Sequence, residues 1–287
     1  MSRIRVGPAG WDYPDWKGVV FPNPKPKGFD PLSYLAGYFS TIEINSTFYG
    51  PASVATAEKW ADRVGDHADF KFTAKLWKRF THERAETWST KEVAEARGGL
   101  DVLYEAGRLG GLLLQFPWSF RRDETNEEWL RDLAKAFRHL PLVLEVRHET
   151  WNSPEVIDWL IERQIGLVNV DQPLFRNSIK PAAVATAPVG YVRLHGRNFR
   201  DWFREKATRD ERYDYLYSAA ELQPWAARIK EVAAKTTEMY AVTNNHHLGK
   251  APANGKMLEG MITGWKVRVP DALLETYQAE LAPYVEG

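Results

Sequence analysis

The 287-residue chain contains no cysteine. This absence excludes disulfide bonds, thiolate nucleophiles and cysteine-bound zinc, so only His, Asp and Glu remain as strong metal ligands. It also favours a reducing compartment, and we predict a cytoplasmic location. No segment approaches the roughly 20 consecutive apolar residues that a membrane span requires, so we expect no membrane association.

The chain also lacks an excess of either charge, because Lys plus Arg and Asp plus Glu both total 38. No overall field therefore attracts nucleic acid or anionic membranes, although a local basic patch can still do so. Gly-rich phosphate loops, dinucleotide fingerprints, Gly-x-Ser-x-Gly elbows and His-Glu-x-x-His motifs are absent too. These absences argue against triphosphatases, dinucleotide enzymes, serine hydrolases and zincins.

What the chain does contain is an alternation of short apolar runs and helical patterns. Eight runs begin near Ile4, Thr41, Asp69, Leu109, Leu142, Gly166, Gly190 and Met239. Helical periodicity follows in most intervals, at residues 31–39, 53–63, 89–104, 127–139, 154–163, 213–234 and 271–281. Such alternation forms parallel strands with helical crossovers. We predict one domain over residues 1–287, a (β/α)8 TIM-like barrel, with a doubly wound open sheet as the alternative.

Polar and apolar side chains alternate within these runs, so one face of each strand is polar. If the apolar face packs on the helices, the polar set converges on the barrel axis near the carboxyl ends of the strands, where such barrels place their chemistry. This set comprises Glu43, Lys75, Gln115, Glu145, Arg147, Asp171, Arg193 and His195. The alternative is a structural network in which these charges only pair with one another.

Six tryptophans fall just after strands: Trp11, Trp16, Trp77, Trp118, Trp151 and Trp202. Loops at one end of the barrel carry them, where they either stack on sugar rings or bases or pack on the barrel top. We select Trp11 and Trp151 as binding residues. Residues 197–212 mix basic, acidic and aromatic side chains, and we predict a solvated loop there in preference to a phosphate-gripping lid.

Several motifs at strand ends together resemble a known family. They are Gly10-Trp11, Glu43-Ile-Asn-Ser-Thr-Phe-Tyr49, Phe72 with Lys75, Thr81-His82, Leu114-Gln115-Phe116-Pro117, Glu145-Val-Arg-His148 with Trp151, Asp171-Gln-Pro173, Tyr191-Val-Arg-Leu-His-Gly196 and Asn244-Asn245. The chain is similar to the YecE-like family, domain of unknown function 72, over nearly its whole length. The resemblance implies a TIM-barrel-like fold and no particular activity, substrate or cofactor.

Our first functional hypothesis is an enzyme acting on an anionic sugar-, nucleotide- or nucleic-acid-like substrate. Cationic groups hold its phosphate or carboxylate, and acid–base residues hydrolyse a glycosidic or phosphodiester bond. The predicted catalytic residues are Glu145, Asp171 and His195. The predicted substrate-binding residues are Lys75, Gln115, Arg147, Arg193, Asn244, Asn245, Trp11 and Trp151.

Two alternatives stay open. In a metal-assisted version, Glu145, His148, Asp171, His195 and His246 hold a divalent ion, although the nearby arginines would repel it. In a non-catalytic version, the aromatic rim binds single-stranded nucleic acid or a glycan. The expected partner is a small anionic or sugar-like ligand, with nucleic acid as the second choice. The oligomeric state is not predictable from these patterns.

Overall fold

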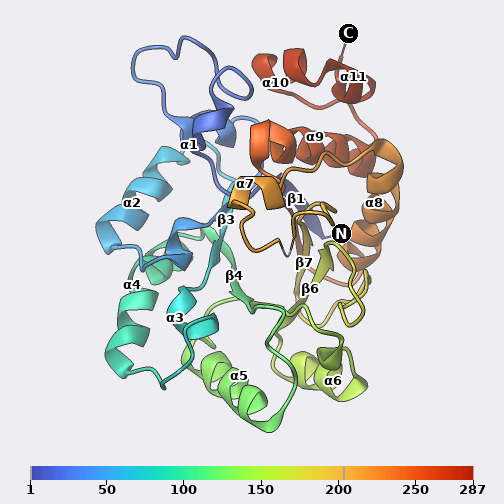
Figure 1. Ribbon diagram of the computed structural model, residues 1–287. Helices are drawn as coiled ribbons and strands as arrows, with labels where there is room; N and C mark the ends of the chain where they lie inside the picture. Colours follow the sequence, from blue (N-terminus) through green and yellow to red (C-terminus); the bar gives the residue numbers. More distant parts are fainter. Residues whose placement is uncertain (1, 203, 287) are drawn as a thin grey trace.

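The computed structural model describes residues 2–202 and 204–286, and its eight strands form a ring that Figure 1 shows surrounded by helices. The strands are β1 (Arg3–Pro8), β2 (Thr41–Ile44), β3 (Lys71–Lys75), β4 (Leu109–Gln115), β5 (Leu142–Glu145), β6 (Gly166–Asp171), β7 (Val189–Leu194) and β8 (Glu238–Thr243). They follow the order β1-β8-β7-β6-β5-β4-β3-β2, and every pairing is parallel. This arrangement confirms the predicted barrel.

The ring closes where β1 meets β2. Ala9 and Glu43 form an isolated parallel bridge, and the Gly10 amide donates to the Glu43 carbonyl at 2.8 Å. A Cβ atom at Gly7 would lie 1.8 Å from the carbonyl oxygen of Thr41. Only glycine fits at this close approach of two backbones, so Gly7 permits the closure.

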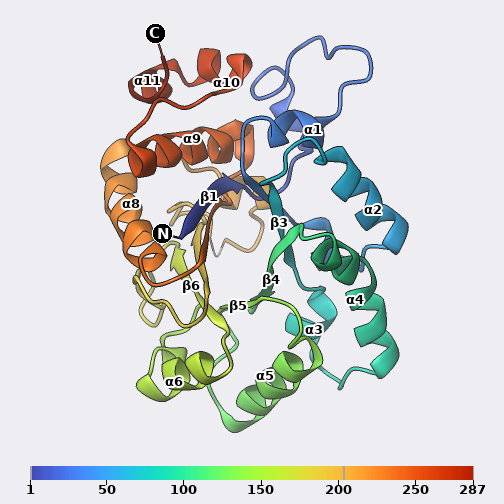
Figure 2. The same ribbon diagram turned by 180° about the vertical axis from the view of Figure 1, so that it is seen from behind.

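Helices surround the strands, as the views from the two sides show (Figures 1 and 2). They are α1 (Pro31–Ala36), α2 (Val54–Arg63), α3 (Lys78–Thr81), α4 (Thr90–Glu105), α5 (Glu124–Ala136), α6 (Pro154–Glu162), α7 (Arg209–Arg212), α8 (Ala219–Ala233), α9 (Lys250–Thr263), α10 (Asp271–Thr276) and α11 (Gln278–Leu281). Among residues 2–202 and 204–286, no helix combines the length and apolar character needed to cross a membrane.

Side-chain caps explain where the longer helices begin. Ser89 before α4 and Ser218 before α8 each form a capping box with the Glu three residues later, Glu92 and Glu221. The Asp123 carboxylate accepts from the Asn126 amide at the start of α5. These caps satisfy amides that have no partner within the helix and typically contribute about 1 kcal/mol each.

Two apolar clusters divide the interior. The larger one lies between strands and helices and includes Ile42, Leu114 and Leu144. The smaller one fills part of the barrel and consists of Ala9, Leu113, Val143, Val168, Val170, Tyr191, Tyr240 and Val242. Buried polar side chains, among them Glu145, Arg193 and His195, lie at the carboxyl ends of the strands, and Arg5 pairs with Glu238 at the amino ends.

Candidate active site at the barrel mouth

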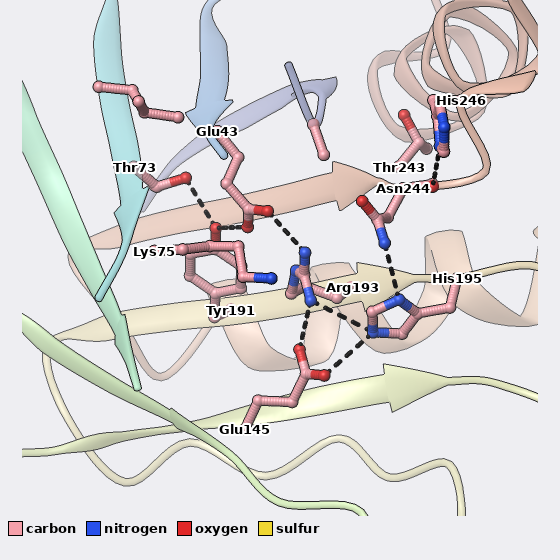
Figure 3. Close-up of polar contacts among 12 residues, drawn as sticks. Glu43, Thr73, Lys75, Glu145, Tyr191, Arg193, His195, Thr243, Asn244 and His246 are labelled. Carbon is pink, nitrogen blue, oxygen red and sulfur yellow. Dashed lines mark hydrogen bonds and ion pairs between the residues drawn. The ribbon is translucent and has the colours of Figure 1, made fainter. Parts of the chain in front are cut away.

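A chain of hydrogen bonds crosses the upper part of the barrel (Figure 3). Arg193, on β7, donates to Glu43 Oε1 at 2.5 Å and to Glu145 Oε2 at 2.7 Å, and so joins β2 to β5. Tyr191 donates to Glu43 Oε2 at 2.9 Å and contacts the Thr73 hydroxyl at 2.7 Å. Arg193, Glu43 and Glu145 are at most 1% exposed. We call Glu43, Glu145, Arg193 and His195 the buried network.

His195 completes the network next to Asn244. The Asn244 amide donates to His195 Nδ1 at 3.0 Å, which places the proton of the neutral ring on Nε2. Nε2 lies 3.1 Å from Glu145 Oε1 and donates to it. Arg147 donates to the same carboxylate oxygen from Nε and Nη2, at 3.2 and 3.0 Å. Both oxygens of Glu145 are thus held by charged or polar donors.

This environment fixes the charge states of the network. Burial alone would raise the pKa of Glu145, but the positive charges around it, Arg193 foremost, hold that pKa well below its usual value. Burial lowers the pKa of His195 to about 3, and the neighbouring Arg147 and Arg193 act in the same direction against Glu145. At neutral pH, Glu145 is ionised and His195 is neutral, and neither titrates near pH 7.

A pocket of about 260 Å³ opens at the mouth beside this network. It is lined by Tyr13, Asn45, Phe48, Tyr49, Lys75, His82, Gln115, Arg212, Tyr213, Asn244 and His246. No Asp or Glu of the described chain is among these residues, whereas Lys75 and Arg212 are cationic. The pocket is therefore electropositive and has aromatic walls. A neighbouring depression of about 320 Å³, lined by Gly10, Trp11, Asp12, Tyr13, Asn45, Ser46 and Tyr49, continues it over the rim.

Lys75 lines this pocket, and the pKa of its amine lies near neutral pH. Its Nζ lies 4.1 Å from the centre of the Phe48 ring, and no hydrogen bond or ion pair joins it to the rest of the described chain. Burial lowers the pKa of Lys75 to about 7, and the positive charge of Arg193 contributes. Figure 3 shows the Lys75 amine pointing toward Arg193. The nearby carboxylates of Glu43 and Glu145 bind Arg193 and do not bind the Lys75 amine.

The comparisons with known proteins agree with this architecture. A family model described as "Protein of unknown function DUF72" matches residues 5–275. The chain belongs to the DUF72 family. UPF0759 protein YunF of Bacillus subtilis is 26% identical over 268 residues, which cover 89% of this chain and 93% of that protein.

Solved DUF72 structures share the fold. The crystal structure of a DUF72 family protein from Thermotoga maritima superposes with a TM-score of 0.78 at 30% identity, covering 91% of this chain and 99% of that one. A second DUF72 family protein, from Enterococcus faecalis, has a TM-score of 0.80 at 22% identity and covers 91% of this chain and 96% of that one.

Within this DUF72 fold, most of the predicted site residues meet at the barrel mouth. Glu145, Arg147, Arg193 and His195 contact one another. Lys75, Gln115 and Asn244 line the adjacent pocket, and Trp11 lines the depression beside it. The structure thus contains both a paired network and an accessible pocket, the two arrangements that the sequence presented as alternatives.

Asp171 does not join them, and its predicted orientation toward the barrel axis is wrong. Its carboxylate accepts two hydrogen bonds from Arg197, at 2.9 and 3.0 Å. Val168 and Val170, on the opposite face of β6, belong to the cluster inside the barrel. The polar face of this strand therefore points outward, because no crossover helix covers it. The Asn169 amide instead bonds the backbone of Val184 in the irregular connection to β7.

Two predicted binding residues also lie away from the pocket. Asn245 donates to the Tyr215 carbonyl and to Asn254 Oδ1, both at 2.8 Å, and so ties the end of β8 to α9. Trp151 is 2% exposed, donates to the Phe120 carbonyl and stacks on the Phe120 ring at a centroid distance of 5.0 Å. Their predicted placement at the ligand site is wrong, since tertiary packing covers both.

The five residues considered as metal ligands are not arranged around one point. Asp171 bonds Arg197, and His148 bonds the Thr150 hydroxyl at 3.0 Å. Within the described part of the chain, no three His, Asp or Glu side chains gather as potential ligands of one ion.

Residues 197–202 and 204–212 lie across the centre of the ring in Figure 1. Arg204 pairs with Asp201 and Glu211 within the segment, whereas Arg197 pairs with Asp171 and Asp210 with His246 outside it. Trp202 covers the network, with its ring 5.4 Å from the Arg147 guanidinium and 6.1 Å from the His195 ring. Arg212, at its end, lines the pocket.

Several pocket residues were not nominated from the sequence. Asn45 and Phe48 lie in the family motif that also contains Glu43, and His82 belongs to another quoted motif, so a signal was present. Tyr13 and Tyr213 lie in loops without strand periodicity, and only the fold brings them to the mouth.

Proposed function

We propose that this DUF72 protein is an enzyme that binds a small, anionic, sugar-like compound in the pocket at the barrel mouth and transfers protons with Lys75. The observation that carries the proposal is a lone amine, poised near neutrality, in a pocket whose described lining has no carboxylate. Groups with perturbed pKa values in concave sites are candidates for catalysis.

The pocket size and lining support this ligand class. A volume of about 260 Å³ is slightly below the roughly 300–1,000 Å³ of drug-sized sites, which suits a monosaccharide-sized compound. Lys75 and Arg212 supply positive charge for a phosphate or carboxylate. The rings of Tyr13, Phe48 and Tyr213 offer apolar faces for a sugar-like ring.

Lys75 suits proton transfer because general acids and bases act best when their pKa is near the working pH. The buried network contributes because the fixed positive charge of Arg193 lowers the pKa of the Lys75 amine. Hydrolysis by Glu145, Asp171 and His195, which we predicted from the sequence, has less support, because Glu145 and His195 do not line the pocket and Asp171 bonds Arg197 outside the barrel. A cytoplasmic location remains a prediction from composition.

Ligand binding can be tested by thermal shift with hexose and pentose phosphates, sorbitol 6-phosphate, nucleoside monophosphates, oligothymidylate and neutral sugars. We expect phosphorylated sugars to stabilise the protein, by about 2.7 kcal/mol at 100 times the dissociation constant. Lys75→Met and Arg212→Ala should weaken this shift. Lys78→Met, which removes a lysine that is paired with Glu83 and does not line the pocket, is the matched control.

Catalysis is then tested by NMR in deuterium oxide with each compound that binds. Exchange of carbon-bound protons, or conversion of the compound, should depend on Lys75. If no phosphorylated compound shifts the wild type, the ligand assignment is wrong. If a compound binds without exchange or conversion, the non-catalytic binding alternative replaces the enzyme; a steep loss of oligothymidylate binding with salt would point to nucleic acid.

A further inference from the structure

We propose that Lys75 forms a covalent imine with the aldehyde or ketone carbonyl of its substrate. This inference rests on the proposed function, because it requires a carbonyl compound to enter the same pocket. It goes further by naming the reactive group of the substrate and the bond that forms.

The position of Lys75 is the first argument. It is the last residue of β3, and its side chain enters the pocket from the interior face of the strand. Lys71, four residues earlier on the same face, is neutralised by Glu238 at 3.1 Å, and Lys78, just beyond the strand, by Glu83 at 2.6 Å. Lys75 has no comparable partner among the described residues. Its Nζ is therefore available to a ligand.

The second argument is that the nearby carboxylates pair with Arg193 and not with the Lys75 amine. Glu43 and Glu145 lie close enough to act on Lys75, yet Arg193 bonds both of them. Arg193 also adds a positive charge that disfavours the ammonium form. A pKa of about 7 leaves roughly half of the amines neutral at neutral pH, and the neutral amine is the nucleophile.

Side-chain amides in the pocket can orient the carbonyl compound. Gln115 ends the neighbouring strand β4, and Asn45 follows β2. Neither side-chain amide makes a hydrogen bond to another described residue, whereas the Asn244 amide already bonds His195. Gln115 and Asn45 are thus free to bind the hydroxyl or carbonyl oxygens of a ligand held over the Lys75 amine.

The chemical step balances without a cofactor. The nitrogen lone pair of neutral Lys75 attacks the carbonyl carbon, and the amine loses one proton as the carbonyl oxygen gains one. Loss of the second nitrogen proton and departure of this oxygen as water leave a carbon–nitrogen double bond. Protonation of the imine nitrogen then makes a positive group that withdraws electrons and acidifies the adjacent carbon.

Reductive trapping tests the imine directly. The full-length protein is incubated with glycolaldehyde phosphate, a small anionic aldehyde, and sodium cyanoborohydride, and modified sites are mapped by mass spectrometry. We expect one adduct per chain, on Lys75, formed at least about tenfold faster than on Lys78, because a large share of the Lys75 amine is neutral and Lys75 lines the pocket. Its rate should rise with pH through about 7.

Variants and a competitor separate the outcomes. Lys75→Arg should abolish the fast adduct, and the matched Lys78→Arg should retain it. Sorbitol 6-phosphate, which has no carbonyl, should slow labelling by occupying the pocket. Adducts spread over surface lysines without preference for Lys75 would overturn the imine. This outcome is read from the wild-type protein, so it does not depend on whether a variant folds. If a phosphorylated compound still stabilises the protein in that case and shows Lys75-dependent proton exchange or conversion, the proposed function survives without the imine; if no phosphorylated compound stabilises the protein, both fail.

Discussion

The buried network and the pocket next to it lie at the same end of the same barrel, yet they treat polar groups differently. Every carboxylate oxygen of Glu43 and Glu145 accepts a hydrogen bond, from donors that include Arg193 and Tyr191. In the pocket, the Lys75 amine and the Gln115 amide have no hydrogen-bond partner among the described residues. The comparison separates polar groups that complete the fold from polar groups left available to a ligand.

This difference matters because buried charges are costly unless they are paired. The network meets that requirement within the protein itself. Lys75 and Gln115 are only partly buried and line the pocket, so their polar groups can reach water or a ligand. We therefore expect substitutions in the network to act mainly on stability and substitutions in the pocket to act mainly on binding.

The largest effect is expected for Glu145→Ala. Removal of this carboxylate leaves Arg193 buried with one of its two ion-pair partners missing, at a cost of about 3–5 kcal/mol in the free energy of unfolding. Urea denaturation measures the change. Glu128→Ala on the exposed face of α5 is the control and should stay within about 0.5 kcal/mol. Equal stability of the two variants would contradict a stabilising role for the network.

A smaller effect, with a defined pH dependence, is expected for Lys75. Its pKa is lowered to about 7 in the folded protein, so between pH 7 and its unfolded value near 10.5 the unfolded chain binds more protons. Stability contributed by Lys75 therefore rises with pH across this window and is lowest below pH 7. Relative to wild type, Lys75→Met should remove at least about 1.4 kcal/mol of that rise, the equivalent of one pKa unit.

Urea unfolding at pH 7.0 and 9.5 measures this difference, with Lys78→Met as the control. An unchanged pH slope in Lys75→Met would show that the amine is as well solvated in the fold as in the unfolded chain. That result would also remove the physical basis for its reactivity.

The smallest change in stability is expected for Gln115→Ala, within about 0.5 kcal/mol, because its amide has no described partner to lose. Asn169→Ala is the matched amide: it removes two hydrogen bonds to the Val184 backbone and should cost about 1–3 kcal/mol. Gln115→Ala should nevertheless weaken the thermal shift by phosphorylated sugars. Equal stability of Gln115→Ala and Asn169→Ala would contradict the distinction between amides that stabilise the fold and amides left free in the pocket.

Strand periodicity predicted the barrel and much of the site, because alternation reports which face of a strand is polar. It could not report which face points inward. On β5 and β7 the polar face lines the barrel, but on β6 the same pattern is inverted, with Val168 and Val170 inside. Asn169 bonds Val184 in the helix-free connection after β6, and Asp171 bonds Arg197 beyond β7; this packing between distant residues has no local signal in the sequence.

Helix prediction failed for a related reason. Helix α9 was not predicted, since Pro252, Gly255 and Gly260 weaken its local propensity. Tertiary contacts support it: a Cβ at Gly260 would lie 2.7 Å from the Tyr284 ring, and Asn254 is fully buried against the 213–217 loop. The predicted helix at 213–234 begins only at Ala219, because residues 213–217 run along the mouth.

The position of Arg193 has a mechanical consequence. Strands β2 and β5 are not neighbours in the sheet, and one guanidinium spans the gap between their carboxylates. Arg193 therefore ties these two strands together across the interior of the ring. A lysine at this position has a single ammonium group in place of a guanidinium that donates to two carboxylates at once. We therefore expect Arg193→Lys to free either β2 or β5 from this link. The shape of the opening would then change, although no residue that lines it is substituted.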